Sequence, residues 1–108
     1  MVKVGINGFG SIGRRFLRAS KRAENYEVVA LNDLADPGNL AYLLKYDSNY
    51  GTLEDDVRVE GQGLNIGGKY VRVFSERDPG NIPWRDVGVD IVLESTGRFT
   101  KKEQAVAH

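Results

Sequence analysis

The chain has 108 residues, a length typical of one domain with a modest hydrophobic core. Its 15 basic and 15 acidic side chains cancel, which argues against a polyanion-binding surface, so no specific nucleic acid partner is expected. The absence of cysteine excludes disulfides and thiol chemistry within these residues, and no apolar run is long enough to cross a membrane. Since the chain begins as a strand rather than a signal peptide, we expect a cytoplasmic protein.

A glycine motif joins the first two predicted elements. A strand from Val2 to Asn7 runs into Gly8-Phe9-Gly10-Ser11-Ile12-Gly13, which has the pattern G-x-G-x-x-G, and a helix is expected from Ser11 to about Ala23. The next strand, from Glu27 to Asn32, is followed at once by an acid, Asp33. This order of strand, loop, helix, strand and acid is typical of a dinucleotide-binding site.

Each part of this motif has a physical role. Gly8 permits a tight turn, Gly10 lets a pyrophosphate approach the backbone, and Gly13 lets the helix pack close to the strand. The start of the helix presents unpaired N–H groups to the phosphates. Asp33 is expected to accept hydrogen bonds from the adenosine ribose, and its charge opposes the 2′-phosphate of NADP, so the predicted cofactor is NAD. The alternative is a glycine-rich turn followed by a surface acid.

The predicted first helix has two different sides. Ile12, Phe16 and Ala19 recur at helical spacing, which predicts that they share an apolar face. Arg14 and Arg18 fall on the opposite side. At zero net charge, we interpret this basic stripe as a solvated face rather than a surface for nucleic acid.

The rest of the pattern alternates strands and helices. Asp36-Pro37 begins a second helix, Gly67-Gly68 forms a two-residue hairpin turn, and a capping box at Thr100 begins a final helix. This alternation predicts an α/β fold, a Rossmann-type and mostly parallel sheet with an added antiparallel hairpin. The later strands are expected from Val57 to Glu60, from Leu64 to Ile66, from Lys69 to Phe74, and from Asp90 to Glu94.

Two loops are expected to meet at the carboxyl ends of the strands. Ligands of such sheets bind there, where the strand order reverses. One is the glycine loop and the other is Ser95-Thr96-Gly97, whose hydroxyls and backbone are predicted to reach the pyrophosphate or the second ribose. An isolated Ser-Thr-Gly is also common in ordinary turns.

A series of sequence blocks follows in an order typical of one enzyme family. Together they resemble the phosphorylating glyceraldehyde-3-phosphate dehydrogenases, and the resemblance covers the whole chain. The close relative that oxidises erythrose 4-phosphate shares much of this region. The blocks are Lys3 to Arg14, Asn32-Asp33-Leu34, Leu43 to Ser48, Asp78-Pro79, Ile82-Pro83-Trp84 and Glu94 to Gly97.

The resemblance implies the NAD-binding portion of a glycolytic enzyme that oxidises and phosphorylates an aldehyde. In the family, the position of Asp33 holds the adenosine ribose, that of Arg77 lies beside the adenine, and that of Phe99 lines the remaining cofactor path. The family usually has Arg where this chain has Ser11. The expected cofactor-binding residues are Asn7, Gly8, Phe9, Gly10, Ser11, Ile12, Gly13, Asn32, Asp33, Arg77, Ser95, Thr96, Gly97 and Phe99.

The family's chemistry needs a cysteine thiolate and a histidine. This chain has no cysteine, and its one histidine, His108, matches no catalytic position. We therefore expect residues 1–108 to be an NAD-binding domain that is incomplete at its C-terminus and has no catalytic residue and no metal site, with the catalytic domain lying outside this chain. The family is homotetrameric, which implies pairing with the rest of the dehydrogenase or with another copy.

Two alternatives remain from the residues alone. The chain is also compatible with a stand-alone nucleotide-binding module and with an interaction protein that keeps the fold but not the ligand. The strand from Asp90 to Glu94 is expected at a sheet edge with an uncovered apolar face. This position predicts marginal stability or association with further protein.

Overall fold

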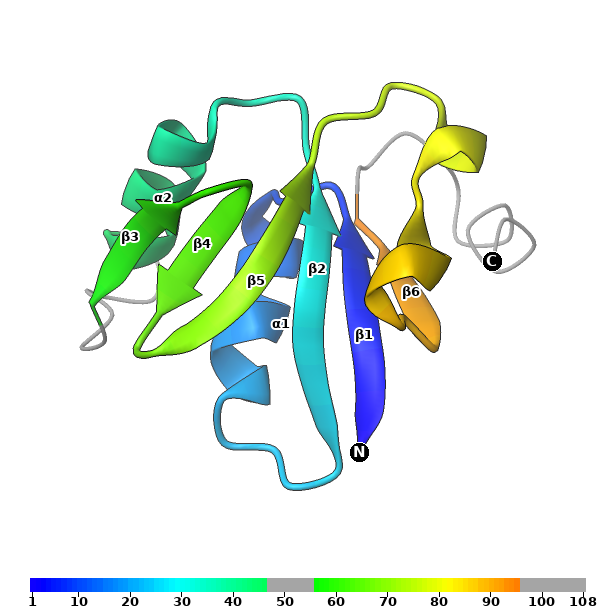
Figure 1. Cartoon of the computed structure of the whole chain (residues 1–108). Helices are drawn as coiled ribbons and strands as arrows, with labels where there is room; N and C mark the ends of the chain where they lie inside the picture. Colours follow the sequence, from blue (N-terminus) through cyan, green and yellow to red (C-terminus); the bar gives the residue numbers. More distant parts are fainter. Residues whose placement is uncertain (47–55, 96–108) are drawn as a thin grey trace.

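The computed structural model describes residues 1–46 and 56–95, which build one six-stranded sheet in the order β3-β4-β5-β2-β1-β6. The central strands β5, β2, β1 and β6 are parallel, whereas β3 and β4 add an antiparallel extension (Figure 1). This arrangement confirms the predicted Rossmann-type fold. The strands are β1 (Val2–Asn7), β2 (Tyr26–Asn32), β3 (Val57–Glu60), β4 (Gly63–Ile66), β5 (Lys69–Phe74) and β6 (Ile91–Glu94).

The two faces of the sheet have different covers. Helices α1 (Ser11–Ser20) and α2 (Pro37–Lys45) lie on one face, and the short 3-10 segments η1 (Pro79–Asn81) and η2 (Trp84–Val87) lie on the other (Figure 1). Helix α2 begins where the sequence predicts it, because the carboxylate of Asp36 accepts a hydrogen bond of 3.0 Å from the N–H of Gly38.

Helix α1 corrects one sequence prediction. It ends at Ser20 rather than near Ala23, and its buried residues are Gly13 and Leu17, whereas Ile12 is 66% exposed. Of the predicted apolar face, Phe16 packs against the core, whereas Ile12 and Ala19 are exposed, so the face is displaced by about one residue around the helix. A Cβ atom on Gly13 would lie 3.0 Å from Cγ2 of Ile6, so the helix contacts β1 at this glycine. Glycine does not add to a pattern of apolar residues, so the pattern does not indicate this contact.

Each face has its own hydrophobic cluster. On the helical face, Leu17, Leu31, Leu44 and Leu64 are almost completely buried. On the other face, Phe74 and Trp84 meet edge to face with 5.9 Å between ring centroids. Trp84 also lies against the backbone of β1, since a Cβ on Gly5 would be 2.7 Å from Cζ3 of the indole.

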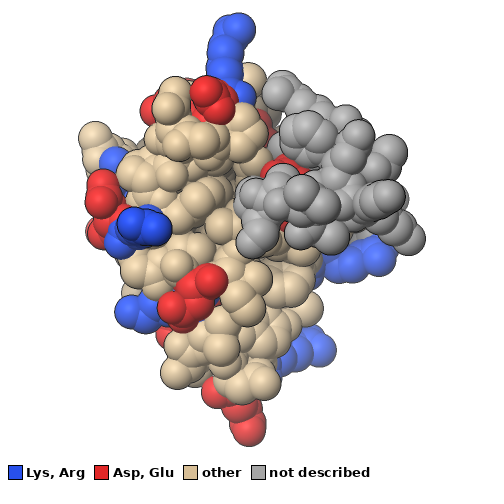
Figure 2. All heavy atoms as spheres, turned by 90° about the vertical axis from the view of Figure 1, so that its right-hand side faces the viewer, with Lys and Arg blue, Asp and Glu red and all other residues tan. Residues whose placement is uncertain are grey.

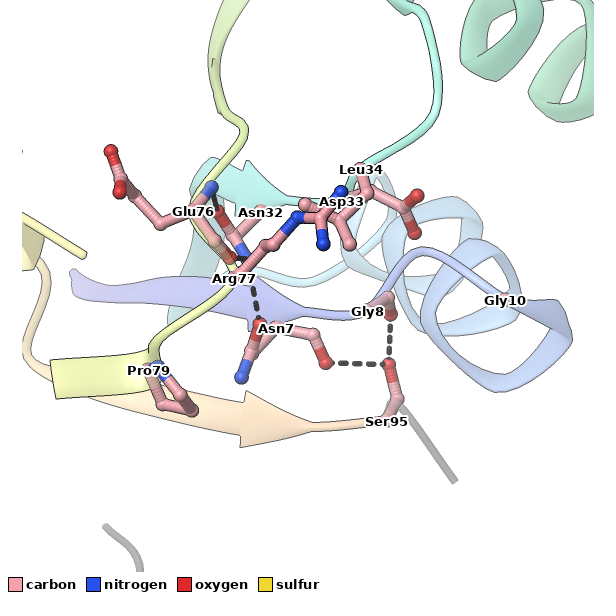
Figure 3. A pocket seen from close by; sticks show the side chains of 10 residues that line it. All are labelled: Asn7, Gly8, Gly10, Asn32, Asp33, Leu34, Glu76, Arg77, Pro79 and Ser95. Carbon is pink, nitrogen blue, oxygen red and sulfur yellow. Dashed lines mark hydrogen bonds between the residues drawn. The ribbon is translucent and has the colours of Figure 1, made fainter. Parts of the chain in front are cut away.

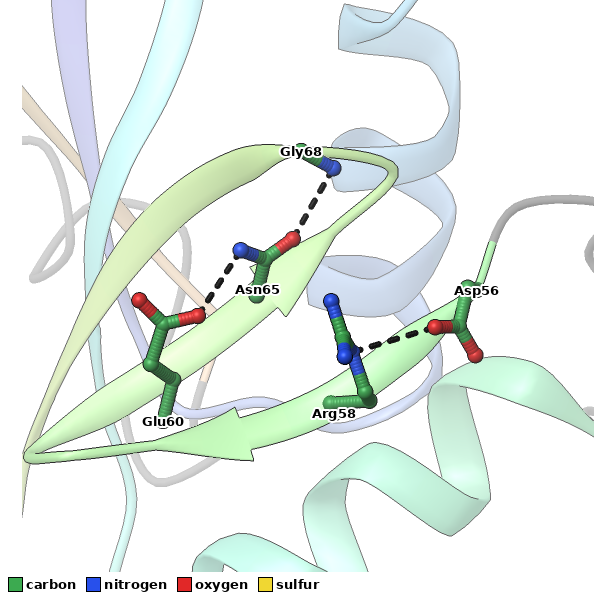
Figure 4. A network of polar contacts seen from close by, with 5 residues as sticks. All are labelled: Asp56, Arg58, Glu60, Asn65 and Gly68. Carbon is green, nitrogen blue, oxygen red and sulfur yellow. Dashed lines mark hydrogen bonds and ion pairs between the residues drawn. The ribbon is translucent and has the colours of Figure 1, made fainter.

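The hairpin of β4 and β5 turns where the sequence predicts it. Gly67 and Gly68 have φ angles of 61° and 92°, which a two-residue turn of this kind requires. The side chain of Asn65 accepts a hydrogen bond from the N–H of Gly68 (2.9 Å) and donates one to Glu60 (2.8 Å), as Figure 4 shows. In the same figure, Arg58 contacts Asp56 at 3.1 Å.

Strand β6 forms an edge of the described sheet, as expected. Its first residue, Ile91, is 57% exposed. The view onto this side of the molecule shows a largely uncharged surface on which basic and acidic side chains are interspersed (Figure 2). The helix predicted from Thr100 lies outside the described residues.

Candidate functional site

A cavity of about 300 Å³ opens at the carboxyl ends of the parallel strands. It is lined by residues at the ends of β1 and β2, by residues that follow β5, and by Ser95, which follows β6 (Figure 3). Such a place, where neighbouring strands lead to connections in opposite directions, is the usual ligand site of an open α/β sheet. The lining residues are Asn7, Gly8, Gly10, Asn32, Asp33, Leu34, Glu76, Arg77, Pro79 and Ser95.

The glycine loop has the geometry that its spacing predicts. Gly8 has a φ of 90°, which favours glycine, and a Cβ on Gly13 would lie 2.7 Å from the carbonyl oxygen of Gly8. Gly10 differs, because a Cβ there would meet no described atom closer than 3.9 Å. The turn and the close packing are thus confirmed, and the space beside Gly10 is open.

The start of helix α1 faces this open space. Gly10 is its N-cap residue and provides no side-chain cap, and its first turn contains no acidic residue. Ser11 and Ile12 are exposed there. Uncapped N–H groups and the positive end of the helix dipole suit a phosphate. Arg14 lies close by, since its guanidinium donates a hydrogen bond of 3.0 Å to the carbonyl of Phe9.

Asp33 is fixed to the glycine loop. One carboxylate oxygen accepts a hydrogen bond from the N–H of Phe9 (2.8 Å), and the other accepts one from the N–H of Ala35 (2.9 Å). A carboxylate has about four lone-pair sites, so each oxygen keeps acceptor capacity for a ribose hydroxyl. The side chain of Phe9 is 1% exposed, so this residue offers the loop its backbone while its ring packs in the core.

Asn7 and Asn32 line the cavity but direct their amides into the protein. Asn32 donates to the side-chain oxygen of Asn7 (3.0 Å), and Asn7 donates to the carboxylate of Glu94 (2.9 Å). Asn32 also pairs with both backbone groups of Glu76, at 3.0 and 2.8 Å. Figure 3 shows the Asn7 and Asn32 amides linked beneath the cavity.

Ser95 joins the end of β6 to the glycine loop. Its N–H donates to the carbonyl of Asn7 (2.8 Å), and its hydroxyl donates to the carbonyl of Gly8. The structure therefore brings Ser95 to the predicted place, with its hydroxyl proton engaged by the loop. Thr96, Gly97 and Phe99 lie outside the described residues.

The opposite wall has a different character. The side chain of Arg77 extends across the cavity in the direction of Leu34, and Pro79 lies on the same side as the chain after β5 (Figure 3). A planar cationic group beside apolar side chains suits a flat aromatic ring. The open space at Gly10, the uncapped helix, the held carboxylate and this wall together fit the phosphates, ribose and base of a dinucleotide.

Comparison with known proteins agrees with this geometry. Residues 2–102 match the family model described as glyceraldehyde 3-phosphate dehydrogenase, NAD binding domain. The chain belongs to this family. NAD is accordingly the cofactor of this glyceraldehyde-3-phosphate dehydrogenase domain, as the glycine loop and Asp33 predict.

Curated relatives give the same family. A glyceraldehyde-3-phosphate dehydrogenase of Geobacillus stearothermophilus is 57% identical over 99% of the chain and 32% of its own length. The cytosolic glyceraldehyde-3-phosphate dehydrogenase of Trypanosoma brucei brucei is 49% identical over 100% of the chain and 33% of its own length. The chain thus spans about a third of the length of these relatives. Within residues 1–46 and 56–95, no helix is long and apolar enough to cross a membrane.

Sequence reasoning missed several residues of the cavity. Leu34, Glu76 and Pro79 line the cavity and are not among the predicted site residues, and neither is the buried Glu94, which accepts a hydrogen bond from Asn7 beneath the cavity. Leu34 and Glu76 are direct neighbours of the predicted Asp33 and Arg77. Their position in the sequence could therefore have indicated that they line the same cavity. The sequence indicates Glu94 more weakly. Like Asn7 and Asn32, it is a polar residue at the end of a predicted buried strand.

Proposed function

We propose that this chain holds the cofactor of an NAD-dependent, phosphorylating glyceraldehyde-3-phosphate dehydrogenase, and that the cavity binds the adenosine half of NAD. One observation carries the assignment of the site. The carboxylate of Asp33 accepts a hydrogen bond from the glycine loop at Phe9. The ribose acceptor and the phosphate-binding loop therefore form one unit with a fixed separation before any ligand arrives.

Each part of the site has a role in this proposal. The N–H groups that begin α1 at Ser11 and Ile12 bind the pyrophosphate, with the guanidinium of Arg14 near the same loop. Asp33 accepts hydrogen bonds from the adenosine ribose, and Arg77 covers the adenine. Thr96, Gly97 and Phe99 continue the site, as predicted from the sequence. When bound, NAD supplies the acceptor for a hydride from the aldehyde carbon.

The chain's contribution is binding and orientation. It contains no cysteine, so the thiolate that attacks the aldehyde comes from residues outside these 108. We propose that the chain alone binds NAD without catalysis. It acts with the rest of the dehydrogenase or with another copy, in the cytoplasm.

A ligand titration of the whole chain tests the site. Replacing Asp33 by Ala removes the ribose acceptor, and we expect affinity for NAD to fall about tenfold, the effect of about 1.4 kcal/mol. The variant also loses its preference for NAD over NADP, because no carboxylate then opposes the 2′-phosphate. Calorimetric titration with NAD, NADP and ADP-ribose measures both effects.

Asp56 provides the matched control. It is an exposed acid directly before β3 and does not line the cavity, so Asp56→Ala keeps wild-type affinity. An Asp33→Ala variant that binds NAD as tightly as the wild type would overturn the assignment of this site. A folded wild-type chain that binds none of the three ligands would favour the interaction-protein alternative.

A further inference from the structure

A row of buried polar side chains crosses the sheet beneath the cavity. Asn7 is 3% exposed, Asn32 is 4% exposed and Glu94 is 8% exposed. They occupy the last positions of β1, β2 and β6, where Asn7 is the direct register partner of both Asn32 and Glu94. Burial of three polar groups is costly unless they are hydrogen-bonded. Here they bond to one another, and we call Glu94, Asn7 and Asn32 the polar row.

The hydrogen bonds of the polar row all point the same way. Asn32 donates to Oδ1 of Asn7, and Asn7 donates through Nδ2 to Oε2 of Glu94. A carboxylate accepts and does not donate, so Glu94 determines which end of the Asn7 amide faces it. The Asn7 oxygen is then turned toward Asn32, which fixes the orientation of the second amide. The charge on β6 thus orders both amides.

At the end of the polar row away from Glu94, Asn32 holds the backbone of Glu76, which leads into the cavity wall that contains Arg77. The Asn32 amide donates to the carbonyl of Glu76 and accepts from its N–H, which is the pattern of two paired peptide groups. Glu76 follows the end of β5 at Phe74 and directly precedes Arg77. Moving or turning the Asn32 amide therefore moves the chain that presents Arg77.

We propose that Glu94, Asn7 and Asn32 are positioning residues, through which a carboxylate on β6 sets the place of Arg77 at the adenine end of the site. The inference rests on the proposed function, because it assigns Arg77 to the adenine. A buried network that only stabilises the sheet predicts loss of stability without a matching effect on ligand binding. The proposal predicts that cofactor affinity follows the pairing of the row.

A carboxylate–amide exchange separates these possibilities. Asn7→Asp places a carboxylate against that of Glu94, so at alkaline pH, where the two groups do not share a proton, they repel and the row cannot pair. Adding Glu94→Gln restores every bond of the row, because the new amide at position 94 donates to the new carboxylate at position 7, which still accepts from Asn32. We expect Asn7→Asp to weaken NAD binding by at least about tenfold, and the double variant to return within about threefold of wild type.

The exchange needs two reference variants measured in the same titration of the whole chain. Leu64→Ala opens the core of the hairpin side without touching the row, so it lowers the melting temperature while NAD affinity below that temperature stays unchanged. Asp33→Ala tests the proposed site itself. Loss of binding in Asp33→Ala, with full binding in Asn7→Asp, would overturn the positioning role and leave the proposed function standing.

If Asn7→Asp does not fold, the single variant Glu94→Gln tests the positioning role by itself. Its amide oxygen still accepts from Asn7, but the hydrogen bond loses the assistance of the charge. We expect a change in the amide resonances of Glu76 and Arg77 and about threefold weaker NAD binding. Unchanged resonances at Glu76 and Arg77 would overturn the proposal, as would a double variant that regains its melting temperature but not its affinity. A wild-type chain that binds no NAD would overturn the proposed function together with this inference.

Discussion

The cavity at the carboxyl ends of the parallel strands and the antiparallel strands β3, β4 and β5 contain the same kinds of residues. The two regions differ in how deeply these residues are buried. Each has an Asn–Glu hydrogen bond of almost equal length, 2.9 Å from Asn7 to Glu94 and 2.8 Å from Asn65 to Glu60. The first pair is buried and the second is exposed. Water replaces a broken exposed bond, whereas a broken buried bond leaves unpaired groups. Equal geometry therefore does not imply an equal contribution to stability.

The two regions also differ in the reason why each contains a glycine. Gly68 has a φ of 92°, and a Cβ there would meet nothing within 4 Å, so its need for glycine comes from the backbone angle alone. Gly10 has an ordinary φ of −81°, and a Cβ there would meet no described atom closer than 3.9 Å, so neither its backbone angle nor its neighbours require glycine. Glycine at position 68 is required by the fold, and we propose that glycine at position 10 is required by the ligand.

The largest expected difference comes from removing one asparagine in each region. Asn32→Leu leaves the Asn7 oxygen and both backbone groups of Glu76 without their partner, and we expect a loss of about 3 kcal/mol in the free energy of unfolding. Asn65→Leu exposes its former partners to water and costs less than about 1 kcal/mol. Urea unfolding of both variants measures the difference. Equal losses would show that burial does not distinguish the two regions.

A pair of glycine substitutions sharpens the comparison at smaller energies. Gly68→Ala forces an L-residue into the left-handed region, and we expect it to lower stability by about 1 to 2 kcal/mol with NAD affinity unchanged. Gly10→Ala is expected to cost less than about 1 kcal/mol, since only the N-cap is altered, but to weaken NAD binding more than about tenfold. Thermal unfolding and calorimetric titration of both variants should give opposite phenotypes. Normal NAD binding by Gly10→Ala would refute the role assigned to the open space.

The smallest expected effect is a pH dependence on the hairpin side. Partial burial, assisted by the charge of Lys69, lowers the pKa of Lys21 below its ordinary value. Between the lowered pKa and the ordinary value of about 10.4, the unfolded chain binds more protons than the folded one, so this group favours folding increasingly as pH rises. Its unfavourable contribution is complete at neutral pH and disappears above the ordinary pKa.

Lys21→Met removes this titration. We expect the melting temperature of the wild type to rise relative to that of the variant as the pH rises from the lowered pKa of Lys21 to the ordinary value of about 10.4. Lys21→Arg is the control that keeps a charge throughout this range. A constant difference between wild type and Lys21→Met across the range would contradict the assigned pKa shift.

The fold was largely predictable from local sequence. Gly67-Gly68 and Asp36-Pro37 mark a turn and a helix start by their own conformational preferences, and the structure has both. The buried face of α1 was not predictable in the same way, because Gly13 contributes to it by having no side chain. A pattern of apolar residues cannot register a contact made by the backbone.

The site was predictable where one motif contains the information. The glycine loop and Asp33 follow from spacing within a single strand–helix–strand unit. The polar row depends on the lateral register of β6 on β1 and of β1 on β2, which brings together Asn7, Asn32 and Glu94 from distant parts of the chain. No local pattern specifies that register, so each residue alone looks like an ordinary strand end.

The packing of Trp84 supplies an optical reporter. It is the chain's single tryptophan, and its ring lies against Gly5 in β1 and edge-on to Phe74 at the end of β5. Its near-ultraviolet emission therefore comes from one known position, on the sheet face opposite the helices. Loss of the contact with β1 moves the indole into water and shifts that emission to longer wavelength. Unfolding of this face can thus be followed without any added label.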